Sequence, residues 1–124
     1  MKGELMTHLH VNNLQDFIDF DDSMVNKEYL MESATAKVKL IALKKHQELP
    51  PHNAEGEALL HVLEGEIKFT VTPGVECLSC GCGDDACEEK EFKIKKGEFI
   101  RFSENHEHYV VAEKDTKLLV ICLH

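Results

Sequence analysis

From residue 37 to the end, the sequence is a series of short segments that have the pattern of β-strands and are separated by turn residues. Residues 66–71 and 91–95 alternate between hydrophobic and polar side chains with a period of two, as strands with one buried face do. Turn dipeptides such as Pro73-Gly74 and Lys96-Gly97 fall between the segments. We predict at least seven strands, at residues 37–43, 58–63, 66–71, 91–95, 98–102, 108–112 and 117–123. Short, evenly spaced strands of this kind indicate an all-β fold, an antiparallel sandwich or barrel.

A short helix is predicted ahead of the strands. Asn12 or Asn13 is suited to cap it, and Leu14, Phe17 and Ile18 would then lie on one face.

The composition limits the class of partner. A chain of 124 residues is predicted to form a single domain, and its net charge of −9 opposes binding to nucleic acid or to anionic lipid. No hydrophobic run approaches the roughly 20 residues that cross a bilayer, and the N-terminus lacks the hydrophobic region of a signal peptide. We therefore expect a cytoplasmic protein with no nucleic-acid or membrane partner, in which thiols stay reduced.

Two segments carry a family resemblance. Residues 49–66 (LPPHNAEGEALLHVLEGE) resemble the first motif of the cupin superfamily, in which a His pair and an acid precede a hydrophobic strand and a Gly turn. Residues 97–108 (GEFIRFSENHEH) resemble the second motif, with Ser103 and Asn105 in place of the family's Pro and Gly. The matching pieces cover residues 35–123, and the likeness is greatest to small single-domain cupins.

The resemblance implies a fold and a pocket. It implies a cupin-type double-stranded β-helix, or jelly-roll barrel, over residues 1–124, which forms a homodimer and holds a small-molecule ligand inside the barrel. Metal-bearing cupins take two His and an acid from the first motif and one His from the second. His52 and His108 match two of these positions, whereas Ala54 and Ala58 stand at the other two. His52 and His108 are therefore predicted to line the ligand pocket, and whether the barrel holds a metal stays open.

The remaining hydrophobic strand residues are expected mainly in the core. These are Leu60, Val62, Phe69, Phe99 and Phe102, together with the thiol of Cys122, which we expect to be buried and inert. His61 has the opposite strand parity to Leu60 and is expected on the other face of its strand.

Four of the five cysteines lie in an insertion at residues 72–90, between two strands that an ordinary small cupin joins by a short turn. Four thiolates in a segment with few hydrophobic residues predict a closed, structural zinc site. Free or redox-switching thiols are the main alternative, followed by disulfides or an iron–sulfur cluster. The predicted zinc ligands are Cys77, Cys80, Cys82 and Cys87.

Three functions stay open from the sequence. The first is a small-molecule-binding cupin, a sensor or accessory protein, whose Cys-rich hairpin binds zinc or responds to redox state. The second is a metal-dependent cupin enzyme of the oxygenase or isomerase type that uses His52, His108 and a further ligand. The third is a structural dimer in which the hairpin contacts a partner.

Overall fold

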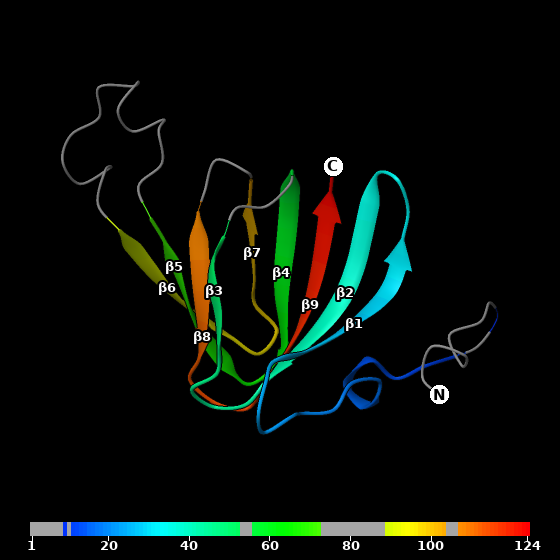
Figure 1. Ribbon diagram of the computed structural model, residues 1–124, viewed down its shortest axis with the longest axis horizontal. Coiled ribbons are helices and arrows are strands. Elements are labelled where there is room, and N and C mark those ends of the chain that lie inside the picture. The colour runs from blue at the N-terminus through cyan, green and yellow to red at the C-terminus, as the bar shows by residue number, and fades with distance from the viewer. Residues whose placement is uncertain (1–8, 10, 53–55, 73–88, 104–106) are drawn as a thin grey trace.

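In the computed structural model the chain forms two antiparallel sheets that face each other across a common interior (Figure 1). The structure describes residues 9, 11–52, 56–72, 89–103 and 107–124, and of His52 it describes the backbone alone. Within these ranges lie one 3-10 turn and nine strands: η1 (Leu14–Asp16), β1 (Asn26–Glu32), β2 (Ala36–Leu43), β3 (Glu48–His52), β4 (Glu57–Glu64), β5 (Glu66–Val71), β6 (Lys90–Lys95), β7 (Phe99–Phe102), β8 (His108–Ala112) and β9 (Thr116–Leu123).

The order of the strands is that of a jelly roll. One sheet has the order β1-β2-β9-β4-β7 and the other β3-β8-β5-β6. Apart from the β1–β2 and β5–β6 hairpins, each connection along the chain crosses from one sheet to the other. The predicted all-β jelly-roll barrel is therefore confirmed. None of the described residues forms a helix with the length and hydrophobicity needed to span a membrane.

All seven predicted strands are present, and the structure adds β1 and β3. Both additions are edge strands with an irregular register, which shifts between Tyr29 and Met31 in β1 and between Leu49 and His52 in β3. Proline lacks the N–H that an interior strand would donate, so the Pro50-Pro51 pair in β3 is compatible with an edge position. These interruptions remove the period of two on which the sequence prediction depended.

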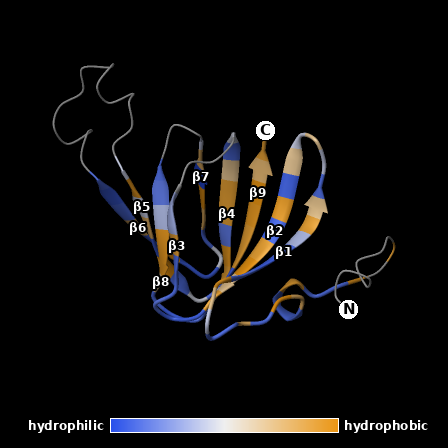
Figure 2. Cartoon of the chain, viewed as in Figure 1, coloured by the Kyte–Doolittle hydropathy of each residue, from blue (hydrophilic) through white to orange (hydrophobic). Residues whose placement is uncertain are grey.

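Hydrophobic side chains from both sheets fill part of the interior between them. Ile67 and Phe69 of β5 pack there with Val62 of β4 and Leu118 of β9, and each of these four is fully buried. Figure 2 shows that β9 and much of β4 are hydrophobic, whereas β2 carries hydrophilic residues in the half nearer the top of the view.

A second hydrophobic cluster covers the outer face of β2. Phe17 and Ile18, which follow η1, pack on Leu40 and Ala42. Asn13 caps η1, because its Oδ1 accepts a hydrogen bond from the amide of Gln15 at 2.9 Å. The predicted helix is thus shorter than expected, but two of its three hydrophobic residues do anchor it to the sheet.

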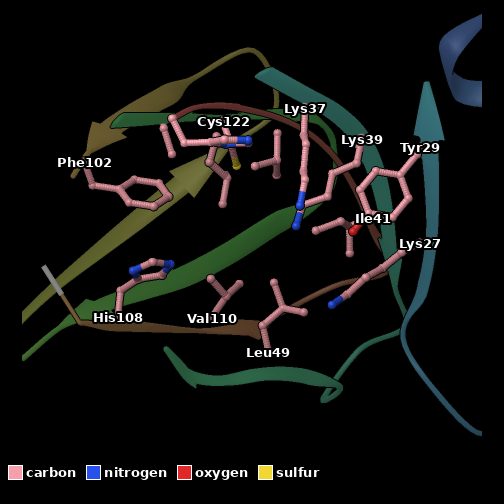
Figure 3. A pocket seen from close by; sticks show the side chains of 14 residues that line it. Lys27, Tyr29, Lys37, Lys39, Ile41, Leu49, Phe102, His108, Val110 and Cys122 are labelled. Carbon is pink, nitrogen blue, oxygen red and sulfur yellow. The ribbon is translucent and has the colours of Figure 1, made fainter. Parts of the chain in front are cut away.

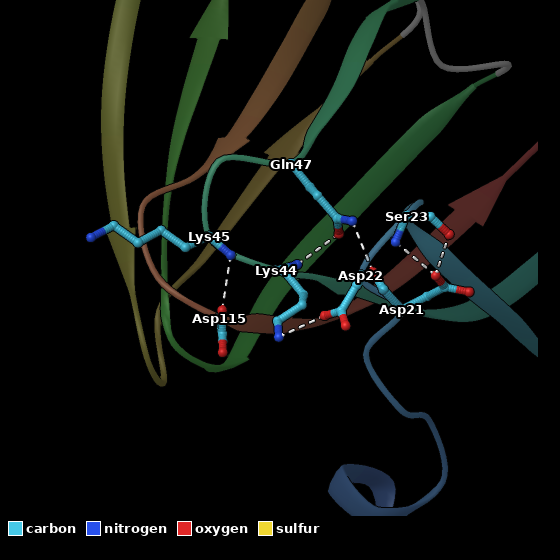
Figure 4. Close-up of polar contacts among 7 residues, drawn as sticks. All are labelled: Asp21, Asp22, Ser23, Lys44, Lys45, Gln47 and Asp115. Carbon is cyan, nitrogen blue, oxygen red and sulfur yellow. Dashed lines mark hydrogen bonds and ion pairs between the residues drawn. The ribbon is translucent and has the colours of Figure 1, made fainter.

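Polar contacts tie the N-terminal segment to the turn between β2 and β3 (Figure 4). The side chain of Gln47 accepts a hydrogen bond from the amide of Lys44 at 2.7 Å and donates one to the carbonyl of Asp21 at 2.9 Å. Lys44 Nζ also lies 2.9 Å from a carboxylate oxygen of Asp22, and this contact raises the pKa of Lys44. Hydrogen bonds from Ser23 lower the pKa of Asp21, so both charged forms are favoured at neutral pH. These contacts fasten the end of the barrel opposite the C-terminus.

Gly65, in the turn between β4 and β5, packs tightly against Thr116. Its φ is +91°, and a Cβ built there would lie 2.7 Å from Thr116 Cα and would also contact the Asp115 carbonyl and Thr116 Oγ1. Thr116 is fully buried, and its hydroxyl accepts a hydrogen bond from the Glu66 amide at 3.1 Å and donates one to the Lys114 carbonyl at 2.7 Å. Gly97 has a similar φ of +88° but no atom within 4 Å of its Cβ position.

Alanine substitutions at these two glycines distinguish the cost of backbone strain from the cost of steric overlap. We expect Gly97→Ala to lower the free energy of unfolding by about 1–2 kcal/mol, the cost of a left-handed conformation in a residue with a Cβ. Gly65→Ala adds the displacement of buried backbone and is expected to lower it by about 2–5 kcal/mol in total. Urea unfolding followed by circular dichroism measures both, and equal losses would contradict the packing described for Gly65.

Candidate ligand pocket

A cavity of about 160 Å³ lies between the two sheets, beyond the filled part of the core (Figure 3). Cavities of about 150 Å³ in other proteins hold a molecule the size of benzene. Side chains from both sheets line it: hydrophobic walls from Ile41, Leu49, Ala58, Leu60, Val110 and Val120, an aromatic corner of Phe102 and His108, and a polar side of Lys27, Tyr29, Lys37, Lys39, Cys122 and His124.

The strand register places these walls. Leu60 of β4 lies opposite Val120 of β9, and Ala58 lies opposite Cys122, so the four side chains form two rows on the inner face. The next row inward consists of Val62 and Leu118, which are fully buried in the core. The pocket thus lies beside the row of Leu60 and Val120 and widens at the smaller side chains of Ala58 and Cys122.

His108 forms a wall of the pocket within an aromatic cluster. Its ring stacks on Phe69, with the centroids 5.0 Å apart and the planes 13° from parallel, and meets Phe102 at 4.4 Å and 59°. The side chain is 2% exposed. His108 therefore contributes packing as well as a polar ring edge to the cavity.

The two histidines named by the cupin motifs are neighbours. His52, the last residue of β3, is the direct register partner of His108 in β8. His108 borders the cavity, whereas the side chain of His52 lies outside the described part of the chain, as do Ala54 and His106.

The described residues do not fit a barrel metal. Ala58 places a methyl group in the pocket wall at the position where the motif comparison expects an acid. Among the residues that the structure describes, no group of three or more His, Cys, Asp or Glu side chains is arranged to hold an ion. The predicted zinc ligands Cys77, Cys80, Cys82 and Cys87 all fall in residues 73–88, outside the described ranges.

The lysines of the pocket are the residues that sequence reasoning missed. Lys37 and Lys39 share the inner face of β2 with Ile41, while Leu40 and Ala42 on the other face are covered by Phe17 and Ile18. Residues 37–43 begin with an alternation that predicts a strand with one solvated face, but both faces of β2 are covered. The unbroken hydrophobic run at residues 40–43 indicates that both faces of this strand are covered. Lys37 and Lys39 face inward because the segment after η1 covers the other face.

Several expected core residues have other positions. Cys122 is half-buried and lines the pocket, because the last pleat of β9 lies beyond the filled core. Phe99 is 58% exposed, since β7 is an edge strand and turns this residue outward. Leu60, Val62 and Phe69 are buried core residues as expected, and Leu60 also lines the cavity together with the partly buried Phe102.

The packing of His108 can be tested by removing its ring. His108→Ala loses both ring contacts and leaves a larger cavity, so we expect the free energy of unfolding to fall by about 2–4 kcal/mol. The same substitution at half-buried His61, on the outer face of β4, is the control and is expected to cost about 1 kcal/mol or less. Urea unfolding gives both values, and a loss at His108 as small as that expected at His61 would show that the aromatic corner does not stabilise the fold.

Comparisons with known proteins agree with this architecture. No curated protein sequence matches the chain significantly. Among solved structures, an RmlC-like cupin protein from Desulfovibrio desulfuricans is 30% identical, with a TM-score of 0.70 over 94% of this chain and 97% of that one. A cupin 2 conserved barrel domain protein from Leptotrichia buccalis is 27% identical, with a TM-score of 0.72 over 91% of this chain and 47% of that one. A cupin superfamily protein from Desulfitobacterium hafniense, at 14% identity and a TM-score of 0.76 over 94% and 93%, shares the fold.

The family model for the cupin domain matches residues 39–124, which include the strands from β3 to β9 and both sequence motifs. With the jelly-roll topology and the pocket between its sheets, this match shows that the chain belongs to the cupin family.

Proposed function

We propose that this cupin binds a small organic molecule in the cavity between its two sheets. The observation that carries the proposal is the cavity itself, about 160 Å³ in volume, with walls of Leu60, Val110 and Val120 and polar groups on one side. A hydrophobic cavity with a few convergent polar groups is the usual form of a ligand site in a protein. Burial of a ligand's hydrophobic part against these walls supplies the affinity, and the polar groups orient it.

The proposed function is ligand binding without catalysis, as in a sensor or accessory protein. A metal-dependent reaction in the barrel needs further ligands beside His108, and Ala58 removes one donor from the described wall. The competing enzyme hypothesis keeps His52 and His108 as ligands and is separated from binding by metal analysis, described below.

Filling the cavity tests the proposal. Ala58→Leu projects a larger side chain into the space beside Phe102, whereas Ala36→Leu makes the same change on the outer face of β2. With benzoate, benzamide and benzyl alcohol as probes at millimolar concentration, we expect at least one to shift the methyl resonances of Leu60, Val110 and Val120. Ala58→Leu should abolish these shifts and Ala36→Leu should preserve them.

Folding is checked for each variant from its circular dichroism spectrum and its melting temperature. If no probe shifts the three methyl groups in the unmodified protein, or if Ala58→Leu leaves the shifts unchanged in a folded protein, the cavity is not the binding site.

We also propose that the Cys-rich connection between β5 and β6 binds a structural zinc ion. The ladder between these strands continues to its last pair, Val71 with Lys90, so the two ends of the connection are held side by side. Fixed ends reduce the entropy that is lost when four distant thiolates gather on one ion. Four cysteine thiolates form a closed tetrahedral zinc site without an open position for chemistry.

Elemental analysis of untagged protein tests the zinc proposal. We expect about one zinc per chain, lost in Cys80→Ser and retained in Cys122→Ser, which makes the same change at a cysteine outside the connection. A metal-free protein whose four thiols oxidise together would contradict zinc and favour a redox function. Iron or manganese that is lost only in the His52→Ala/His108→Ala double variant would instead favour the metal-dependent enzyme.

A further inference from the structure

The charges that line the pocket are opposite in sign to those of the whole chain. The protein has 23 acidic and 14 basic residues, yet the described lining includes Lys27, Lys37 and Lys39 and no Asp or Glu side chain. A random sample of this chain would contain more carboxylates than amino groups. The pocket therefore concentrates positive charge that the surface as a whole does not have.

The three lysines come from neighbouring strands and lie on one side of the cavity. Lys27 of β1 pairs with Ile41 of β2, and Tyr29, two residues further along β1, pairs with Lys39. Lys37 follows on the same face of β2, about 7 Å along the strand from Lys39. In Figure 3 these side chains extend from one side of the cavity, and His108 and Phe102 lie at the other.

The three lysines differ in how they are paired. Among the described residues, neither Lys27 nor Lys39 has an ion-pair partner, and Lys39 Nζ lies 6.0 Å from the centroid of the Tyr29 ring. Lys37 lies 3.8 Å from the carboxylate of Glu32, whose side chain is 57% exposed. Like charges held on one face repel each other, and a bound anion would remove that repulsion.

We infer that the ligand is a small organic carboxylate, and this inference rests on the proposed binding function. Its carboxylate would lie among Lys27, Lys37 and Lys39, and its hydrophobic body would lie against Leu60, Val110 and Phe102. Lysine ammonium groups attract carboxylates and phosphates alike as point charges, so phenyl phosphate is included in the test to separate the two anions. The volume of about 160 Å³ limits the body to roughly the size of one six-membered ring.

Benzoate and benzamide test the charge, because they have nearly the same shape and only benzoate is an anion. Titration of the full chain, followed by the methyl resonances of the pocket, is expected to show benzoate binding about tenfold or more tightly than benzamide. Lys39→Met should weaken benzoate by about tenfold and leave benzamide unchanged, so that benzamide binding also shows that the variant is folded. Lys27→Met, at a more exposed position, provides a second variant with the same expected direction.

Lys93→Met is the matched control, since it removes the same charge from an exposed position on β6. We expect it to leave benzoate affinity within about twofold of the unmodified protein, because screening weakens distant surface charges. The carboxylate inference would be overturned if benzoate and benzamide bound equally tightly and if neither affinity changed in Lys39→Met or Lys27→Met. The binding function would remain in that case.

Tighter binding of phenyl phosphate than of benzoate would also overturn the carboxylate inference. If benzoate, benzamide and phenyl phosphate all failed to bind, the binding function itself would be contradicted.

Discussion

The register of β9 between β2 and β4 determines both the core and the pocket. All eight residues of β2 pair with β9, and β4 pairs with the other edge of the same strand. Each inward-facing residue of β9 therefore lies in a row with one residue of β2 and one residue of β4. The row through Leu118 joins Ile41 to Val62 and is buried, with Ile41 at the border of the cavity, whereas all three residues of the row through Cys122, which joins Lys37 to Ala58, line the cavity. A slip of β9 by one residue would turn its inward side chains, Leu118, Val120 and Cys122, to the outer face.

The cavity follows from the size of the side chains in the upper rows. Ala58 and Cys122 are small, so the inner face of β4 and β9 recedes from the opposite sheet at this level. Close packing normally removes such space, and a void costs stability unless a ligand or water occupies it. Phe102 and His108 fill one side by stacking, and the long side chains of the lysines border the other. The small side chain of Ala58 thus leaves the space in which the proposed ligand would lie.

The sequence predicted the strands more completely than it predicted the site. A period of two survives in regular, half-buried strands, and it is lost at the bulges and the Pro50-Pro51 pair of the edge strands β1 and β3. His108 was found through the spacing of a motif. The inward orientation of Lys37 and Lys39 depends instead on which side of β2 the segment after η1 covers, and this is a tertiary contact that local periodicity does not encode.

The position of the lysines explains how a protein with a net negative charge can bind the proposed anionic ligand. At physiological ionic strength the field of a distant charge is largely screened beyond about 8 Å, so the groups nearest the ligand dominate its binding. Three amino groups bordering one cavity then attract a small anion even though the chain carries a net charge of −9. A polyanion such as nucleic acid is too wide to enter a space of about 160 Å³ and would meet the acidic exterior instead. Net charge and pocket charge therefore act on partners of different sizes, and together they select small anions over large ones.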